Sequence, residues 1–219
     1  PMGVVAALIP TTNPTSTAIY KALIGVKGRN AIVMSPHPRA VKCINEAVRI
    51  MHEAAVQAGA PKDLILAMTI PTLEGTQELM RHRRTAVILA TGGSPMVKAA
   101  YSSGKPAYGV GPGNVPAIIE RTADVPKAVR DIVNGKCFDH GVLCSAENSI
   151  VCDAPVDAQV RAELPKNGAV IVTGEDRAKL QRAMQDRRSG GVSAEIVGLS
   201  AMAIAQQAGI TVPEGTRVL

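Results

Sequence analysis

The sequence predicts an α/β protein: a Rossmann-like parallel sheet with helices on both faces, plus part of a second α/β domain. Short β-branched or aliphatic runs alternate with longer segments whose apolar residues recur every three or four positions. Gly and Pro separate most of these segments. Repeated βα alternation of this kind is typical of a parallel sheet covered on both sides.

The first half of the chain has the clearest alternation. Strands are predicted over residues 4–9, 31–34, 64–68, 86–90 and 107–110, and helices over 15–26, 39–58, 74–81 and 95–102. The helix over 39–58 is the best defined, because its apolar residues share one face: Val41, Ile44, Val48, Met51 and Ala55. Its Cys43 and His52 are therefore interpreted as packing and surface residues rather than ligands.

A segment rich in Gly and Pro, residues 109–116, interrupts this alternation and cannot continue a regular element. We place the domain boundary after Pro116, which gives one domain over 1–116 and a second domain over 117–219. In the second domain, helices are predicted over 125–134, 157–164, 176–185 and 193–208, and strands over 149–152 and 169–173.

Composition excludes several classes of protein. Hydrophobic residues make up 46% of the chain, yet no uncharged apolar run approaches the ~20 residues of a membrane span. The net charge of +6 is spread along the sequence and aromatic residues are only 2%, which argues against a nucleic-acid interface. The four cysteines lack CxxC spacing and the density of a disulfide scaffold, which favours a reducing cytoplasm and argues against a structural zinc or other metal.

Cys144 is the strongest candidate nucleophile. It lies in a loop that begins at Gly141 and ends at a short apolar strand, beside the polar residues Ser145, Glu147 and Asn148. A thiol is reactive only as thiolate, which forms more easily in a polar, partly wet loop than among apolar side chains. An isolated cysteine is nevertheless most often a small buried apolar residue, so the hypothesis depends on its companions.

Four segments, residues 9–17, 29–39, 90–106 and 138–151, together carry a resemblance. In this order and spacing the chain resembles the coenzyme-A-acylating branch of the aldehyde dehydrogenase superfamily, which includes the aldehyde half of bifunctional aldehyde–alcohol dehydrogenases. Aldehyde domains of that family are considerably longer, so the resemblance implies that the chain is a fragment with an aldehyde dehydrogenase-like fold. Residues 1–116 would be a nucleotide-binding domain without its N-terminal part, and residues 117–219 a catalytic cysteine domain without its C-terminal part.

The resemblance implies catalytic roles for two residues. Cys144 would attack the aldehyde carbonyl, and Asn13 would donate its side-chain amide to the oxyanion together with the backbone N–H of Cys144. Taken alone, Asn13 before Pro14 is ordinary turn chemistry. His140 and Glu147 are interpreted as structural residues, and Cys137 and Cys152 are the alternative nucleophiles.

The same resemblance implies NAD or NADP and coenzyme A as cofactor and co-substrate. The expected cofactor-binding residues are Thr11, Thr12, Ser35, His37, Arg39, Thr91, Gly92, Gly93, Ser94, Gly111 and Gly113. The turn over 91–94 joins a strand to a helix, where N–H groups favour a phosphate, although it also fits a simple tight corner. Near Arg39 no acidic residue repels a 2′-phosphate, so NAD and NADP both remain open.

The absence of a side chain at Gly109 is informative. Family members that release free acids carry a water-activating glutamate where this chain has Gly109. Without that general base a thiol is the better acyl acceptor, which points to acyl-CoA as the product. Acetaldehyde is the first expected substrate and sulfoacetaldehyde the second. Open sheet edges predict a homo-oligomer, and the alternative function is a nucleotide-binding or assembly module without turnover.

Overall fold

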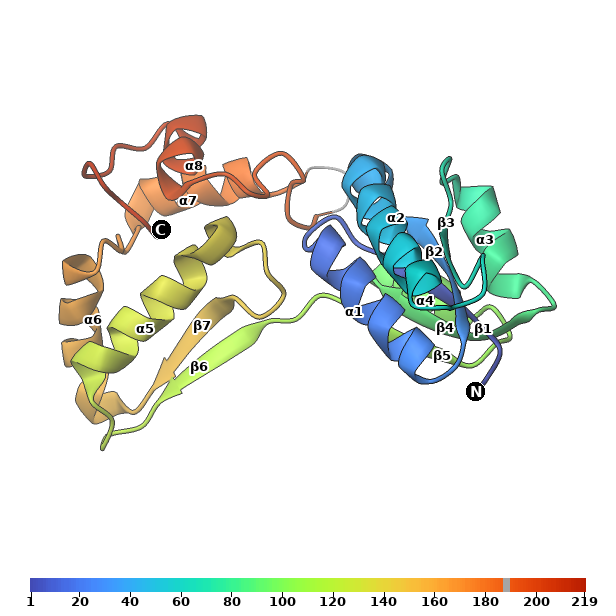
Figure 1. The fold of residues 1–219 in the computed structure, drawn as a ribbon. Coiled ribbons are helices and arrows are strands. Elements are labelled where there is room, and N and C mark those ends of the chain that lie inside the picture. Colours follow the sequence, from blue (N-terminus) through green and yellow to red (C-terminus); the bar gives the residue numbers. More distant parts are fainter. Residues whose placement is uncertain (187–189) are drawn as a thin grey trace. The chain divides into compact units, whose positions relative to one another are not determined.

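The computed structural model describes residues 1–186 and 190–219, and the chain divides into two compact units (Figure 1). Unit 1 is Pro1–Pro112 and unit 2 is Gly113–Leu219. This division lies four residues before the predicted one, because the segment after Pro112 forms a strand, β6 (Val115–Ile119), that pairs within unit 2. Pro116 is tolerated there because a two-stranded sheet consists only of edge strands.

Unit 1 contains a five-stranded parallel sheet in the order β3-β2-β1-β4-β5. Its strands are β1 (Val4–Ile9), β2 (Ala31–Pro36), β3 (Ile65–Ala67), β4 (Thr85–Thr91) and β5 (Ala107–Val110). Its helices are α1 (Pro14–Lys27), α2 (Val41–Gln57), α3 (Leu73–Arg81) and α4 (Ser94–Tyr101), with a 3-10 turn, η1 (Pro38–Ala40), before α2. The predicted parallel α/β architecture is confirmed.

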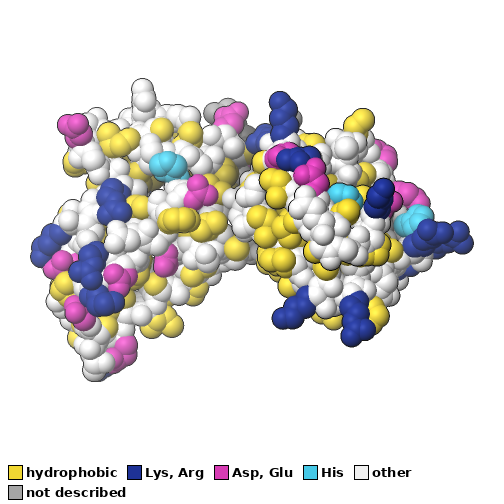
Figure 2. Space-filling model, in the orientation of Figure 1, with side chains coloured by type: hydrophobic (Ala, Val, Ile, Leu, Met, Phe, Trp, Pro, Cys, Tyr) yellow, Lys and Arg dark blue, Asp and Glu magenta, His cyan; other side chains and the backbone are white. Residues whose placement is uncertain are grey.

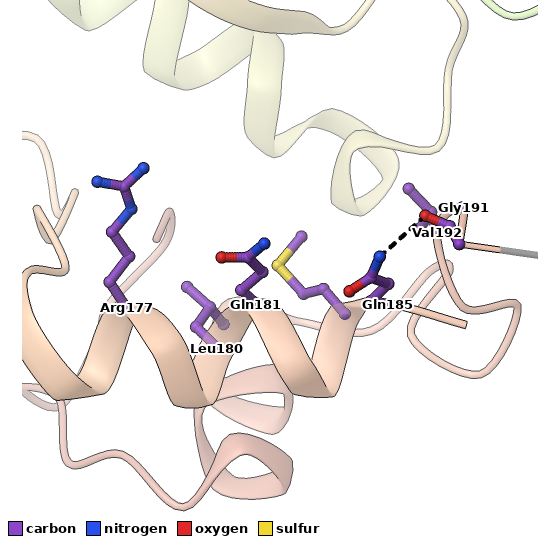
Figure 3. A pocket seen from close by; sticks show the side chains of 8 residues that line it. Arg177, Leu180, Gln181, Gln185, Gly191 and Val192 are labelled. Carbon is purple, nitrogen blue, oxygen red and sulfur yellow. Dashed lines mark hydrogen bonds between the residues drawn. The ribbon is translucent and has the colours of Figure 1, made fainter. Parts of the chain in front are cut away.

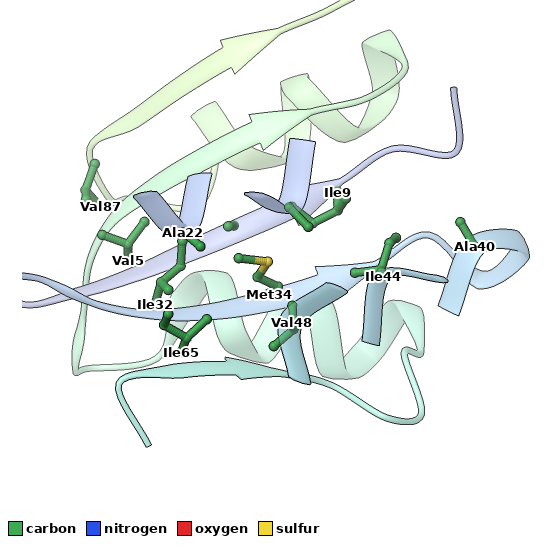
Figure 4. Close-up of a cluster of buried hydrophobic side chains, with 12 residues drawn as sticks. Val5, Ile9, Ala22, Ile32, Met34, Ala40, Ile44, Val48, Ile65 and Val87 are labelled. Atoms are coloured by element: carbon green, nitrogen blue, oxygen red, sulfur yellow. The ribbon is translucent and has the colours of Figure 1, made fainter. Parts of the chain in front are cut away.

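Alternating residues of β1 assign the helices to the two faces of this sheet. Val5, Ala7 and Ile9 pack in one buried cluster with residues of α1 and α2, among them Ala18 and Ile44 (Figure 4). The intervening residues of β1 pack in a second cluster with Met80 of α3 and Ala100 of α4. Because side chains alternate across a strand, the central strand is buried on both sides.

Unit 2 is a smaller α/β layer. The parallel pair of β6 and β7 (Glu147–Cys152) packs against α5 (Val125–Cys137) and α6 (Asp157–Lys166). Val129 and Val133 of α5, Ile119 of β6 and Val160 of α6 are buried in one cluster. The 3-10 turns η2 (Phe138–Gly141) and η3 (Ala154–Val156) lead into β7 and out of it, respectively.

Two predictions for the C-terminal part are wrong. Residues 169–173 form no strand, and Ala169 makes only an isolated bridge with Val218. The helix predicted over 193–208 is confined to α8 (Ala201–Ala208), because Gly198 has a left-handed backbone with φ of 84° and the Ser200 hydroxyl caps the helix by accepting from Ala203 N. The remaining helix, α7 (Gly174–Met184), is close to its predicted range.

Charge and hydropathy of the surface agree with a folded α/β domain. On the face of unit 2 drawn in Figure 2, basic and acidic side chains are interspersed. Unit 2 has several exposed short-range ion pairs, such as Arg161 with Asp157 at 2.9 Å. Within the described ranges, no helix is both long enough and apolar enough to cross a membrane.

Candidate active site

The carboxyl-terminal edge of the unit 1 sheet collects most of the predicted site residues. Parallel strands end at a common edge, and in an open α/β sheet ligands bind where the connections from neighbouring strands run in opposite directions. That position lies here between β1 and β4, which are neighbours in the sheet but not in the sequence. The loops at this edge carry Thr11, Thr12 and Asn13 after β1, Ser35, His37 and Arg39 at β2, Thr91, Gly92, Gly93 and Ser94 at β4, and Gly111 after β5.

Asn13 occupies the residue before α1 with its amide nitrogen free. Pro14 begins the helix, and the Asn13 side chain makes no capping hydrogen bond. Its Oδ1 accepts from the Thr12 hydroxyl at 3.2 Å, whereas Nδ2 has no partner among the described residues. The backbone carbonyl of Asn13 accepts from Thr17 N at 3.1 Å, which fixes the residue to the first turn of α1. Asn13 is half-buried, and the N–H groups of its side-chain amide are available to donate, as an oxyanion donor requires.

The loop after β2 is tied to the neighbouring strand. His37 N donates to Ile9 O at 3.0 Å, and His37 Nδ1 accepts from Arg39 N at 3.2 Å. Burial, followed by the nearby Arg39 charge, lowers the pKa of His37. Arg39 is exposed, whereas Ser35 is buried and its hydroxyl lies 2.7 Å from that of Thr76. Because Thr76 Oγ1 donates to Thr72 O, the Ser35 hydroxyl is the donor in this pair and links the sheet to α3.

The turn after β4 presents an open helix N-terminus. Gly93 precedes α4 and provides no side-chain cap, and Ser94 is exposed. Gly92 N donates to Val110 O at 3.1 Å, which holds the turn against the end of β5. Thr91 Oγ1 is buried without a hydrogen-bond partner in the part of the chain that the structure describes. A buried hydroxyl without a partner is rare in proteins, and it fits a polar ligand atom or an ordered water. Near it the N–H groups of Gly93 and Ser94 are available, because Pro95 has none and Met96 N and Val97 N donate to Gly93 O.

Gly109 in β5 lies against α4 with no room for a side chain. A Cβ at this position would lie 2.5 Å from Val97 Cγ1 and 2.9 Å from Tyr101 Cε2. The Tyr101 hydroxyl accepts from Gly109 N at 3.0 Å, so the phenol also occupies the backbone donor of this residue. By contrast, a Cβ at Gly111 would meet nothing within 4 Å. The position where related hydrolytic enzymes are expected to carry their base is thus closed here.

Cys144 lies in a hydrogen-bonded turn in unit 2. Ala146 N donates to Leu143 O at 3.0 Å, which leaves Cys144 and Ser145 as the exposed central residues of the turn. Ala146 is buried and anchors the turn to the unit. A Cβ at Gly113 would lie 3.5 Å from the carbonyl oxygen of Cys144, so these two predicted site residues are neighbours.

A left-handed segment precedes this turn. Asp139, His140 and Gly141 all have positive φ, at 49°, 50° and 71°. Beside it, Lys136 Nζ donates to Asn148 Oδ1 at 2.6 Å and bridges the end of α5 and the start of β7. Burial lowers the pKa of Lys136, and the negative charge of Glu147 opposes this shift. The structural interpretation of His140, which is exposed, and of Glu147 stays a prediction.

The other cysteines differ from Cys144 in their contacts. Cys137 and Cys152 end α5 and β7, are partly buried, and contact Arg217 O and Asp157 Oδ1 respectively. Cys43 is exposed on α2, and its Sγ lies 3.2 Å from Ala40 O. All four are free thiols. Only Cys144 combines exposure with a position in a turn rather than in a regular element.

Sequence reasoning missed two residues of this region, Tyr101 and Lys21. Tyr101 occupies the space beside Gly109, a contact that no local sequence pattern predicts. Lys21 had a detectable signal, because it falls on the buried stripe of α1 formed by Thr17, Ala18, Lys21, Ala22 and Gly25. A lysine on a helix face that otherwise packs in the core is unusual and marks a specific interaction.

A groove in unit 2 contains none of the predicted residues. It runs along α7 and is lined by Arg177, Leu180, Gln181, Met184, Gln185, Gly190, Gly191 and Val192 (Figure 3). Gln185 Nε2 donates to Gly190 O at 3.2 Å at one end. No titratable pair or cysteine lines it, so it offers no catalytic group.

The fold defines the class of protein: an α/β protein with a Rossmann-like parallel sheet. The chain belongs to the aldehyde dehydrogenase family, whose family model matches residues 1–192.

Individual relatives support this membership. The chain is 48% identical over its whole length to the bifunctional aldehyde-alcohol dehydrogenase AdhE of Escherichia coli K12. It matches the structure of a probable aldehyde dehydrogenase from Listeria monocytogenes with 54% identity and a TM-score of 0.96. It also matches a propionaldehyde dehydrogenase from Rhodopseudomonas palustris, solved with bound CoA and an acylated cysteine, with 35% identity and a TM-score of 0.92.

All of this chain is covered in each comparison, but the relatives are longer. The chain spans 24% of the E. coli protein, 48% of the Listeria chain and 50% of the Rhodopseudomonas chain. The predicted resemblance to aldehyde dehydrogenases, including the aldehyde half of bifunctional enzymes, is confirmed.

Proposed function

We propose that this chain provides the cofactor-binding edge and the nucleophile of a CoA-acylating aldehyde dehydrogenase. The reaction converts a short aldehyde, NAD(P)+ and CoA into acyl-CoA, NAD(P)H and a proton. Acetaldehyde is the first expected substrate and sulfoacetaldehyde the second. Family membership and the relative with CoA and an acylated cysteine support this proposal.

The residues at the edge of unit 1 fit a nicotinamide dinucleotide. The N-terminus of α4 and the Gly92–Gly93 turn suit a phosphate, and the buried Thr91 hydroxyl lacks a protein partner. The exposed Arg39, with no acidic residue beside it in sequence, is compatible with either NAD or NADP. When bound, the nicotinamide supplies the hydride acceptor.

Cys144 carries the covalent chemistry in this proposal. Its thiolate forms a C–S bond with the aldehyde carbon, and the carbonyl oxygen becomes an oxyanion that the Asn13 amide and the Cys144 N–H stabilise. Loss of hydride from this adduct leaves a thioester on Cys144. The CoA thiolate then attacks the thioester carbon, and the C–S bond to Cys144 breaks as acyl-CoA leaves.

The closed position at Gly109 is the observation that carries the choice of acyl acceptor. Val97 and Tyr101 occupy the space where a glutamate side chain would begin, so no carboxylate can activate water from there. A thiol needs no such base, because part of it is already ionised near neutral pH. We therefore expect thioester transfer to CoA to outpace hydrolysis.

Selective alkylation of the chain tests the nucleophile. Cys43 and Cys144 are both exposed, so exposure alone predicts similar rates with iodoacetamide, whereas a catalytic thiol reacts faster. We expect mass spectrometry to find Cys144 modified first, and Cys43→Ala to leave that rate unchanged. Equal rates at the two sites would favour a binding module without turnover.

An absorbance assay at 340 nm with acetaldehyde, sulfoacetaldehyde and either cofactor, with and without CoA, tests the reaction. We expect NAD(P)H formation that depends on CoA and is lost in Cys144→Ala but kept in Cys43→Ala. CoA-independent formation of the free acid would contradict the assigned acceptor.

A further inference from the structure

Lys21 of α1 is buried beneath the carboxyl-terminal edge of the sheet. Its side chain is 1% exposed, and its Nζ donates to Leu8 O at 2.8 Å and to Leu89 O at 2.9 Å. Leu8 belongs to β1 and Leu89 to β4, so one ammonium group joins two strands. The two leucines are 81 residues apart in the sequence (89 − 8). No other described lysine or arginine is buried to this degree.

The bridge lies where the two strands part. Pairing between β1 and β4 ends at Leu8 and Ala90, whereas β1 continues alongside β2 as far as Ile9 and Pro36. Beyond this point β1 leads to the loop that carries Asn13, and β4 leads to the Gly92–Gly93 turn. The bridge therefore lies at the base of the crevice where the cofactor is proposed to bind.

The surroundings of Lys21 are otherwise apolar, with few polar contacts. Burial lowers the pKa of Lys21 to about 7 with no contribution from a charged side chain, while the two carbonyl bonds favour the protonated amine. The only described ring near it is that of Tyr20, with its centroid 6.0 Å from Nζ. Thr17, one turn earlier on α1, is buried, and its hydroxyl has no hydrogen-bond partner among the described residues.

A buried amine is costly unless it is paired, and an apolar residue would pack this helix face against the sheet without that cost. The carbonyls that Lys21 contacts belong to the two strands whose loops carry the proposed chemistry, and to no other strand. These contacts are therefore directed at the site rather than at the core in general.

We propose that Lys21 is a positioning residue that fixes the loops after β1 and β4, and so sets the placement of Asn13 and of the Gly92–Gly93 turn. This inference rests on the proposed function. A small displacement of an oxyanion donor lowers the rate of the chemical step without changing the groups that bind the aldehyde.

Hydrogen exchange by mass spectrometry on the full chain tests the positioning directly, with no need for turnover. Lys21→Met removes the donors but keeps an apolar side chain of similar length, and Lys27→Met is the matched control at an exposed position of the same helix. The amides of Thr17 and Gly92 report on the two loops, because they donate to Asn13 O and Val110 O at 3.1 Å. We expect both to exchange roughly tenfold faster in Lys21→Met, with β2 unchanged. Lys27→Met should match the unmodified chain throughout.

Lys21→Gln keeps two N–H donors on a shorter side chain and carries the test if Lys21→Met does not fold. Exchange at Thr17 N and Gly92 N should then rise above that of the unmodified chain, while exchange in β2 does not. A uniform increase over the whole sheet, or no increase at the two loops, would show that Lys21 is only a core residue and would overturn the proposal.

Kinetics of acyl-CoA formation provide a second readout. We expect Lys21→Met or Lys21→Gln to lower kcat roughly tenfold while KM for the aldehyde stays within about twofold. A rise in KM with unchanged kcat would contradict a positioning role. If no variant and no unmodified chain forms acyl-CoA, the proposed function fails, but the exchange experiment still decides the role of Lys21.

Discussion

Gly109→Ala tests how completely the space between β5 and α4 is filled. The new Cβ would lie 2.5 Å from Val97 Cγ1 and 2.9 Å from Tyr101 Cε2, distances at which at least one neighbour must move. Overpacking of this kind costs about 1–3 kcal/mol. Displacing the phenol also weakens the Gly109 N to Tyr101 bond, which contributes about 0.5–1.5 kcal/mol. We therefore expect Gly109→Ala to destabilise unit 1 by about 2–4 kcal/mol.

Differential scanning calorimetry measures this cost. For a unit of this size the expected loss lowers Tm by roughly 4 °C per kcal/mol, or about 8 °C at the lower end of the range. Gly111→Ala is the matched control, because it lies two positions further on, has no left-handed backbone and would meet nothing within 4 Å. Its Tm should stay close to that of the unmodified chain.

A double variant identifies the contact responsible. Val97→Ala removes the Cγ1 atom nearest to the new methyl group, so Gly109→Ala should cost less in that background, by about 1 kcal/mol or more. If Gly109→Ala and Gly111→Ala had the same Tm, the packing argument would be refuted, and with it the steric reason for excluding a general base at this position.

Three further predictions concern catalysis, pH and assembly. Asn13→Ala should lower kcat for aldehyde oxidation by roughly 10²-fold with little change in cofactor affinity, and a loss of cofactor binding alone would assign Asn13 to the nucleotide site instead. The lowered pKa of Lys21, about 7 against 10.5, means that the folded chain holds fewer protons than the unfolded chain between these pH values. Unfolding free energy should therefore rise with pH in this window, by up to about 1.4 kcal/mol per unit, and urea titrations of Lys21→Met should lack that slope. Tyr108 on the edge strand β5 and Ile118 on β6 are 70% and 78% exposed, so we expect self-association by light scattering after size exclusion; a monomer at all concentrations would contradict this.

The sequence was sufficient for the sheet of unit 1 but not for all of unit 2. Strands such as β1 and β4 are short apolar runs between turn residues, and the helices that follow them have regularly spaced apolar residues. The apolar periodicity and the positions of the turn residues therefore predict the same elements. Strand β6 was missed because Pro116 and the glycines before it are turn signals, which an edge strand can nevertheless contain. The run at 169–173 has strand composition but finds only Val218 as a partner, a long-range contact that local patterns do not encode.

For the candidate site too, local sequence patterns do not predict contacts between distant elements. The positions of Asn13 and Thr91 at strand ends follow from the predicted parallel strands, which end at one edge of a sheet. Their roles rest on the family resemblance and stay predictions. The closure at Gly109 by Tyr101 and the bridge made by Lys21 depend on contacts between a helix and distant strands. Only the interruption of the apolar stripe of α1 hints at the second of these in the sequence.

The buried clusters of the two units have no residue in common, which bears on the cooperativity of unfolding. The two clusters of unit 1 lie within residues 5–107, and that of unit 2 lies within 119–218. Cooperative unfolding follows shared packing, so each unit can lose its structure as a separate foldon. A single Tm for the chain would then average two transitions. A cavity at Val129 should shift one transition and a methyl group at Gly109 the other, so that the turn with Cys144 can unfold while the sheet of unit 1 stays folded.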